Sequence, residues 1–470
     1  MKAVRYHLSI PRFLLHRLLG KHFPGVYYRA PWAAVRLDEI PRPKLPEVPG
    51  EPGHLPGLGR VPAWVRIRPL LSGICGSDMG TIMGKNSPAL SPFVSFPAVL
   101  GHELVGRVVE LPAPAVMGAN GPLRVGDRVV VDPALGCRAR GLDPCPACRR
   151  GEAYLCERSA DGTISPGMIL GFCRDLPGSW AEEMVAPAEQ VFRVPDEVSS
   201  ERAVLVEPFS IGLRAVLRGL QLANGENGDG AGSGGSDGSG GGGRELSPRL
   251  QVLIIGGGTI GLTTLAAIHL LGVEGGIDAG VTVLARHRFQ RELALELGAT
   301  RVVANGTELV RTATEILDVR TFRPVIGPPV YTGGFDLVFD CVGSRQTIDQ
   351  ALRLTRAGGR IVLVGAAGEL PGLDWTFVWT RELTIIGSYG YGVEYRLAAV
   401  APSLAAAVAP APHTFAVALE LLRRHPGYPL ERLVTHRFPL SEWRQALATN
   451  VCHGPHRAVK SVFVFPDRVE

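Results

Sequence analysis

The stretch Val252-Leu253-Ile254-Ile255-Gly256-Gly257-Gly258-Thr259-Ile260-Gly261 decides the fold of this 470-residue chain. Its four apolar residues predict a buried strand, and the apolar run that continues to Leu271 predicts a helix directly after the glycines. In G-x-G-x-x-G the first glycine permits a tight turn, the second lets the backbone approach a pyrophosphate, and the third lets the helix pack on the strand. The helix amino terminus offers N–H donors to the anion. A dinucleotide site is therefore predicted on Gly256, Gly258, Thr259, Ile260 and Gly261. A glycine-rich turn without a ligand is the alternative, because 59 glycines produce such spacings by chance.

Strand and helix patterns alternate after this motif. Strands are predicted at 281–284, 337–339 and 360–364, with helices at 289–297 and 347–354. Near-continuous apolar strands joined by helices are typical of a parallel sheet covered on both faces. Before about residue 210 the pattern changes to short strands broken by Gly and Pro, of which 63–68 alternates in the manner of an edge or half-buried strand. The predicted fold class is α/β: a doubly wound parallel sheet plus a β-rich domain.

The composition excludes several classes of protein. Apolar residues make up 46% and charged residues 20%, as in ordinary globular chains. Lys and Arg number 49 against 44 Asp and Glu, an excess too small to predict a nucleic-acid partner. No apolar run is long enough to span a bilayer, so no membrane partner is expected. Residues 13–19 favour a short helix or hairpin that covers the first domain over a signal peptide. Eight cysteines are too sparse for a disulfide scaffold, which favours a cytoplasmic location.

The residues after strand 281–284 bear on the choice of cofactor. A carboxylate there would accept hydrogen bonds from the ribose of NAD, but the chain continues Ala285-Arg286-His287-Arg288. An arginine in this place can bind a 2′-phosphate that a carboxylate would repel. NADP is therefore favoured over NAD, with Ala285, Arg286 and Arg288 at the site. The alternative is that these are solvated residues at the start of a surface helix.

Four cysteines occupy a short segment rich in Gly, Pro and Arg: Cys137, Cys145, Cys148 and Cys156. Four thiolates can close a tetrahedral zinc site, and a segment with so few apolar residues needs such a clip to hold its shape. A structural zinc site is predicted here. Free buried thiols are the less favoured alternative.

A second set of metal-ligand types is spread along the chain: Cys75, His102 with Glu103, and Glu207. One thiolate, one imidazole and one carboxylate leave a coordination position open for a water or a substrate oxygen, as a catalytic zinc needs. Each residue alone is more often part of a core or a surface. Their joint presence upstream of a dinucleotide motif favours a metal site.

The order of these motifs resembles that of the zinc-containing medium-chain alcohol dehydrogenase family. The matching segments are 73–78, 101–103, the four cysteines, 206–208, 256–261, 339–343 and 357–360. The similarity runs from about residue 65 to 465. Glu207 stands where typical alcohol dehydrogenases carry Cys, so the chain is most similar to the polyol, sorbitol and threonine dehydrogenase branch.

The resemblance implies a domain organisation and an oligomer. Residues 1–210 would form a GroES-like catalytic domain that includes a structural-zinc lobe at 137–156. Residues 211–389 would form a Rossmann domain with a disordered Gly-rich insertion at 224–243, and residues 390–470 would return to the catalytic domain. A homo-oligomer, dimer or tetramer, is expected.

Two departures from the family concern the site: Leu142 stands where the first structural cysteine is expected, so Cys137 must reach through a longer loop, and Gly80 replaces a relay His.

The implied activity is hydride transfer between NAD(P) and a polyol, amino alcohol or secondary alcohol. Zinc on Cys75, His102 and Glu207 would lower the pKa of the substrate hydroxyl, and whether Glu103 is a further ligand stays open. Ser77 is the candidate for passing the proton. Asp78 either fixes the ring of His102 or caps the helix after Cys75.

Three further interpretations complete the sequence-based picture. Lys460 occupies the family position of a basic residue near the cofactor phosphates, although a plain surface lysine is the favoured reading. An NADPH-dependent aldehyde or ketone reductase is the first alternative function. A zinc-structured, dinucleotide-binding protein without turnover is the second.

Overall fold

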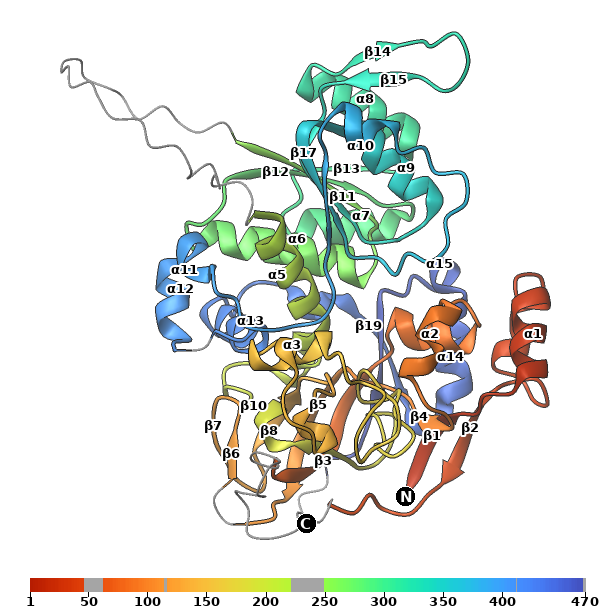
Figure 1. The fold of residues 1–470 in the computed structure, drawn as a ribbon, viewed down its shortest axis with the longest axis vertical. Helices are drawn as coiled ribbons and strands as arrows, with labels where there is room; N and C mark the ends of the chain where they lie inside the picture. Colours follow the sequence, from red (N-terminus) through yellow and green to blue (C-terminus); the bar gives the residue numbers. More distant parts are fainter. Residues whose placement is uncertain (46–61, 114–115, 221–248, 411, 468–470) are drawn as a thin grey trace, which may run out of the picture.

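Two sheets organise the chain, a parallel one in the upper half of Figure 1 and a mostly antiparallel one in the lower half. The computed structural model describes residues 1–45, 62–113, 116–220, 249–410 and 412–467. The Gly-rich stretch 224–243 lies outside these ranges. Within them, no helix has the length and apolar character needed to cross a bilayer.

The upper sheet has six strands, all parallel, in the order β13-β12-β11-β16-β17-β18. Its strands are β11 (Leu250–Ile255), β12 (Ala279–Leu284), β13 (Arg301–Val303), β16 (Phe335–Asp340), β17 (Thr355–Leu363) and β18 (Thr384–Gly387). Numbered along the chain, this is the order of a doubly wound dinucleotide-binding sheet, with the direction of winding reversing between β11 and β16. The predicted fold class is confirmed.

Helices cover both faces of this sheet, and the side chains of β11 show why. Val252 and Ile254 enter the core under one layer of helices, whereas Leu253 and Ile255 point to the other. The first layer contains α5 (Val206–Leu220), α6 (Thr259–Val273), α7 (Arg288–Glu296) and α13 (Thr414–Arg424). The second contains α8 (Gly306–Leu317), α9 (Arg345–Leu354) and α10 (Thr376–Thr380). A strand that is apolar on both faces therefore has a packing partner on each.

The lower sheet has seven strands in the order β10-β8-β5-β3-β20-β19, with β9 also paired to β3. Its strands are β3 (Trp64–Gly73), β5 (Leu104–Glu110), β8 (Arg128–Val131), β9 (Met184–Pro187), β10 (Val191–Arg193), β19 (Val434–Pro439) and β20 (Lys460–Val464). A smaller sheet contains β1 (Lys2–Tyr6), β2 (Val35–Glu39) and β4 (Ala98–Val99). The last strand of the chain, β20, thus lies between β3 and β19.

Of the two readings predicted for 63–68, the half-buried strand is confirmed, since Val65 and Ile67 are buried while Arg66 and Arg68 are partly exposed, and the edge strand is wrong. β3 lies inside the sheet, and most of its residues are buried. Its alternating charges are tolerated because acids neutralise them: Arg66 Nη2 lies 3.0 Å from Glu110 Oε2, and Arg68 Nη2 lies 3.6 Å from the buried Glu183. A charged alternation thus accompanies ion pairs along an interior strand here.

Short helices carry or flank the residues of interest. They are α1 (Ile10–Leu19), α2 (Gly76–Ile82), α3 (Pro146–Arg149), α4 (Ser200–Ala203), α11 (Leu397–Val400), α12 (Pro402–Ala407), α14 (Trp443–Val451) and α15 (His453–His456). Helix α1 stands at the right-hand edge of Figure 1, next to α2 and α14. The predicted short helix over 13–19 is thus present as α1.

Candidate functional site

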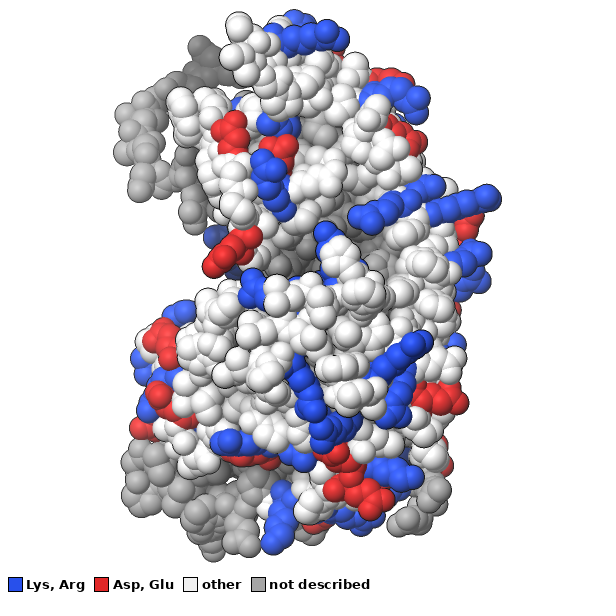
Figure 2. Space-filling view, turned by 90° about the vertical axis from the view of Figure 1, so that its right-hand side faces the viewer, with Lys and Arg blue, Asp and Glu red and all other residues white. Residues whose placement is uncertain are grey.

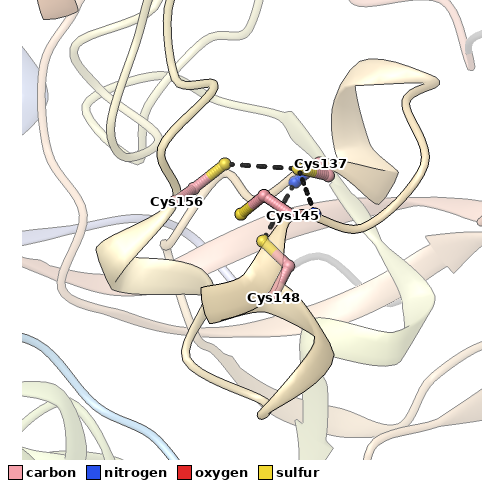
Figure 3. Close-up of side chains that lie close together, drawn as sticks. All are labelled: Cys137, Cys145, Cys148 and Cys156. Atoms are coloured by element: carbon pink, nitrogen blue, oxygen red, sulfur yellow. Dashed lines mark hydrogen bonds between the residues drawn. The ribbon is translucent and has the colours of Figure 1, made fainter.

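The four cysteines of the lobe come together (Figure 3). The sulfur atoms of Cys137, Cys145, Cys148 and Cys156 all lie within 4.8 Å of one another. Cys137 belongs to the group in spite of its longer spacing, because Gly141 adopts φ +66° and Leu142 N–H donates to Cys137 O, which turns the chain back. Leu142 packs beside the group.

Backbone amides support sulfur ligands in this lobe. Cys145 N–H donates to Cys137 Sγ at 3.3 Å, and Cys137 N–H donates to Cys148 Sγ at 3.4 Å. Hydrogen bonds from Cys148 lower the pKa of Cys156 to about 5, whereas burial raises the pKa of Cys137 to about 11. Four sulfur donors at these separations fit a tetrahedral zinc ion.

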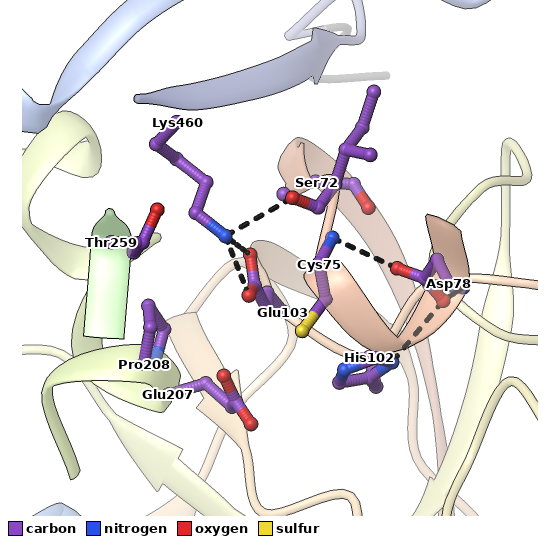
Figure 4. Close-up of polar contacts among 12 residues, drawn as sticks. Ser72, Cys75, Asp78, His102, Glu103, Glu207, Pro208, Thr259 and Lys460 are labelled. Atoms are coloured by element: carbon purple, nitrogen blue, oxygen red, sulfur yellow. Dashed lines mark hydrogen bonds and ion pairs between the residues drawn. The ribbon is translucent and has the colours of Figure 1, made fainter. Parts of the chain in front are cut away.

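A second group forms where α2 begins (Figure 4). Donor atoms of Cys75, His102 and Glu103 lie within 4.8 Å of one another. Cys75 is the residue before α2, and His102 and Glu103 precede β5, so two segments of the lower sheet bring them together. A thiol, an imidazole and a carboxylate are the ligand types that zinc takes, so the residues present fit this metal.

Asp78 caps α2, and its other oxygen lies near the ring of His102. Its Oδ2 accepts a hydrogen bond from Cys75 N–H at 3.0 Å, which caps α2, and its Oδ1 lies 3.5 Å from His102 Nδ1. The ring of His102 is almost fully buried, and its Nδ1 has this electrostatic contact without a well-directed hydrogen bond. Burial alone would lower the pKa of His102, but Asp78 and Cys75 outweigh it and the pKa is raised. On the other side of the ring, Ser77 Oγ lies 3.3 Å from Nε2.

Lys460 contacts Glu103 from β20, so the favoured reading of a surface lysine is wrong. Its Nζ lies 2.6 Å from both carboxylate oxygens of Glu103 and donates to Ile74 O at 3.1 Å. Glu103 is 0% and Lys460 2% exposed. Burial alone would lower the pKa of Lys460, yet the charge of Glu103 raises it overall. Gly73 must lack a side chain here, because a Cβ would lie 1.9 Å from Glu103 Oε2.

Glu207 faces the same region from the first turn of α5. Figure 4 shows its carboxylate on the side toward which the thiol of Cys75 points. It lies outside the group of donors within 4.8 Å. The hydroxyl of Tyr391 donates to its Oε1, and burial, followed by the negative charge of Glu103, raises the pKa of Glu207 to about 8.

The glycine motif has the shape that a dinucleotide needs. Gly256 turns the chain at φ +117°. A Cβ on Gly258 would meet nothing within 4 Å, so the amino terminus of α6 is open to an incoming group. A Cβ on Gly261 would lie 1.8 Å from Gly256 O, so only glycine lets α6 approach β11 this closely. Thr259 and Ile260 form the first turn of α6.

Basic side chains gather around a cavity beyond the end of β12. The cavity has a volume of about 440 Å³ and is lined by His287, Arg288, Phe289, Glu292, Gly454 and Arg457. Its one lining acid is neutralised, since Glu292 lies 2.8 Å from Arg288 and 3.7 Å from Arg457. Ala285 is buried next to the motif, and Arg286 is exposed beside the cavity without lining it. The ring of His453 lies 5.8 Å from that of His287.

The sequence did not predict the contacts that three of these residues make: Lys460, Tyr391 and Arg457. All come from the last 80 residues, whereas the groups that they contact lie 165 to 386 residues earlier in the chain. No local pattern marks them. The one usable signal is the extended run Lys460–Val464, which indicates a strand but not its neighbours.

Comparisons with known proteins identify the family. The family descriptions "alcohol dehydrogenase GroES-like domain" and "zinc-binding dehydrogenase" match residues 61–196 and 260–406. An L-idonate 5-dehydrogenase of Vitis vinifera is 30% identical over 395 residues, which is 83% of this chain and 85% of the relative. A sorbitol dehydrogenase of Arabidopsis thaliana is 27% identical over 413 residues, 88% of this chain and 91% of the relative. The fold is shared with the crystal structure of 2R,3R-butanediol dehydrogenase from Bacillus subtilis, at a TM-score of 0.62 and 21% identity over 99% of both chains. The chain belongs to the zinc-containing medium-chain alcohol dehydrogenase family.

Proposed function

We propose that this protein is a zinc-dependent dehydrogenase that oxidises a polyol, an amino alcohol or a secondary alcohol with NAD(P), and with NADP in preference to NAD. The observation that carries the proposal is the position of the second donor group beside the dinucleotide motif. Pro208, next to Glu207, accepts a hydrogen bond from Thr263 of α6 at 3.0 Å. Val459, next to Lys460, accepts one from Thr259 at 3.0 Å.

The donor set divides into ligands and a supporting carboxylate. Cys75, His102 and Glu207 would hold a catalytic zinc, and the four cysteines of the lobe a structural one. Both oxygens of Glu103 contact Lys460, so Glu207 is the carboxylate that remains for the metal. Tyr391 occupies only one oxygen of Glu207, which leaves the other free.

The chemistry needs a hydroxyl that loses its proton and a carbon that loses hydride. When bound, zinc lowers the pKa of an alcohol hydroxyl, and the nicotinamide accepts the hydride. Ser77 is placed to receive the hydroxyl proton, since its Oγ lies beside His102 Nε2 and a hydroxyl can accept and donate at once. Asp78 holds the ring of His102 in orientation. Lys460 neutralises Glu103, so that the site does not accumulate a second buried negative charge beside Glu207.

The cavity beyond β12 supports NADP. A 2′-phosphate would meet His287, Arg288 and Arg457, whereas the carboxylate that binds the ribose of NAD has no counterpart at Ala285. An NADP preference also leaves a carbonyl reductase as the second candidate function, because the same site can catalyse the reaction in either direction. The names of the relatives, both of them dehydrogenases of polyol-like compounds, favour oxidation.

Two matched substitutions test the zinc assignment. The wild-type protein should carry about two zinc ions per chain. Cys75→Ser should lose one of them together with alcohol oxidation, and should keep cofactor binding. Cys148→Ser is the control that should lose the other ion. The proposal fails if Cys75→Ser keeps the full zinc content and undiminished oxidation of the best alcohol found in a screen of the three alcohol classes with NAD and NADP.

A further inference from the structure

The segment around α1 exposes large apolar side chains on the outside of the protein. Between residues 10 and 32 these are Ile10, Leu14, Leu18, Leu19, Phe23 and Trp32. Ile10, Leu14 and Leu18 recur every four residues and therefore form a stripe along one side of the helix. Ile10 and Leu18 are 72% and 73% exposed. Side chains of this size are seldom left in water as a contiguous group.

Positive charge surrounds this stripe. Residues 1–37 contain no Asp or Glu, and the segment carries the exposed Arg17, Lys21 and Arg29 and the half-buried Arg12. Within the described part of the chain, no ion pair joins any of these four to an acid. At about 100° per residue, Arg17 lies at one edge of the exposed side of α1 and Arg12 at the other. Figure 2, which faces the side of the molecule that carries α1, shows a broad area without acidic side chains bordered by Lys and Arg.

The stripe belongs to a firmly held element. His16, on the inner side of α1, is 1% exposed, and its ring nitrogens contact Ile82 O at 2.9 Å and Trp32 O at 3.1 Å. Tyr27 is buried against the same helix, and its hydroxyl donates to His16 O at 3.4 Å. The helix therefore makes its contacts within the protein through its inner side. Its outer apolar side is left to contact another surface.

We propose that the stripe formed by Ile10, Leu14 and Leu18, together with the exposed side chains of Phe23 and Trp32 that follow it in the chain, binds reversibly to the surface of an anionic lipid bilayer. An apolar stripe edged by Arg and Lys matches the boundary between acyl chains and charged headgroups, and aromatic side chains favour the same depth. A second copy of the chain fits less well, because a two-fold contact would bring the same cations together with no acid to neutralise them. The earlier expectation of no membrane partner rested on the lack of a spanning run, which surface binding does not require. The proposal is independent of the proposed catalytic function.

The test is sedimentation of the full-length protein with lipid vesicles. Vesicles of mixed phosphatidylserine and phosphatidylcholine are compared with vesicles of phosphatidylcholine alone, at low and high salt. Ile10→Ser/Leu14→Ser/Leu18→Ser removes the stripe, and Arg12→Gln/Arg17→Gln/Lys21→Gln removes the charges. Leu295→Ser, an exposed apolar residue of α7, is the matched control. Alcohol oxidation in solution and melting temperature show that each variant is folded.

The wild type should sediment with the anionic vesicles, less so at high salt, and not with phosphatidylcholine. Each cation removed should lower the partition coefficient roughly five-fold, and the stripe variant should lose binding while Leu295→Ser keeps it. Emission from the half-exposed Trp32 should shift to the blue on binding, and Trp32→Phe should abolish that shift. Absence of binding to anionic vesicles overturns the proposal. So does unchanged binding by the folded stripe variant, or a stripe variant that dissociates an oligomer while vesicle binding stays the same.

Discussion

The buried pair of Lys460 and Glu103 gives the sharpest prediction. Lys460→Met leaves a carboxylate that is 0% exposed without its cation and removes the hydrogen bond to Ile74 O. Two unit charges 4 Å apart attract by about 4 kcal/mol at an effective dielectric constant of about 20, and breaking a buried pair costs about 3–5 kcal/mol. We therefore expect the free energy of unfolding to fall by about 3–5 kcal/mol.

Urea unfolding at a fixed zinc concentration, followed by tryptophan fluorescence, measures this loss. With a denaturant slope of about 3 kcal/mol per molar, the midpoint should fall by about 1 M or more. The double variant Glu103→Gln/Lys460→Met, which removes both charges, should recover much of the loss, because a neutral pair leaves no uncompensated buried charge. Arg288→Met is the control, since its 2.8 Å ion pair with Glu292 is solvent-exposed and should be worth less than about 1 kcal/mol. A loss below about 1 kcal/mol for Lys460→Met, or a double variant no more stable than the single one, would refute the reasoning.

Three other predictions concern the cavity beyond β12 and the four-cysteine lobe. Arg457→Gln should weaken NADP binding about ten-fold or more and leave NAD binding unchanged, since a hydrogen bond to a charged group is worth about 1.5–3 kcal/mol; equal losses for both cofactors in a titration would contradict the assignment. Burial, with His287 and Arg286, lowers the pKa of His453 from 6.5, and a bound 2′-phosphate should raise it again. NADP affinity should therefore rise more steeply as the pH falls toward 6.5 in the wild type than in His453→Asn, and parallel pH profiles would exclude the effect. If the four cysteines of the lobe hold zinc as proposed, its chelation should lower the melting temperature, and Cys148→Ser should start from that lower value and respond less. An equal response would speak against a zinc clip.

The parallel sheet could be predicted from the sequence because its signals are local. Val252–Ile255 is apolar on both faces. Of the glycines after it, Gly256 has a positive φ and Gly261 lies where a Cβ would clash, as a strand–turn–helix unit requires. The four-cysteine site could be predicted equally well, because the spacing of the cysteines alone suggests that they share a metal ion. Even the longer gap after Cys137 follows from one glycine at φ +66°.

The parts that escaped prediction depend on contacts between distant segments. The alternation at 63–68 allowed an edge strand, but Glu110 and Glu183 supply the charges that let β3 run through the middle of the sheet. In the sequence, Lys460 is an ordinary lysine at the start of a strand. Its role becomes visible only when β20 is placed beside β3. The contacts of Tyr391 and Arg457 likewise depend on where the fold places their segments.

The insertion of β20 between β3 and β19 has a consequence for how the protein matures. Residues 460–464 leave the ribosome 357 residues after Glu103, yet Lys460 supplies the counter-charge for that carboxylate. Until β20 is synthesised, a nascent chain holds an open sheet and an unmatched carboxylate next to the proposed zinc ligands. Completion of that pocket therefore waits for β20, and a chain truncated before residue 460 should be unable to close it.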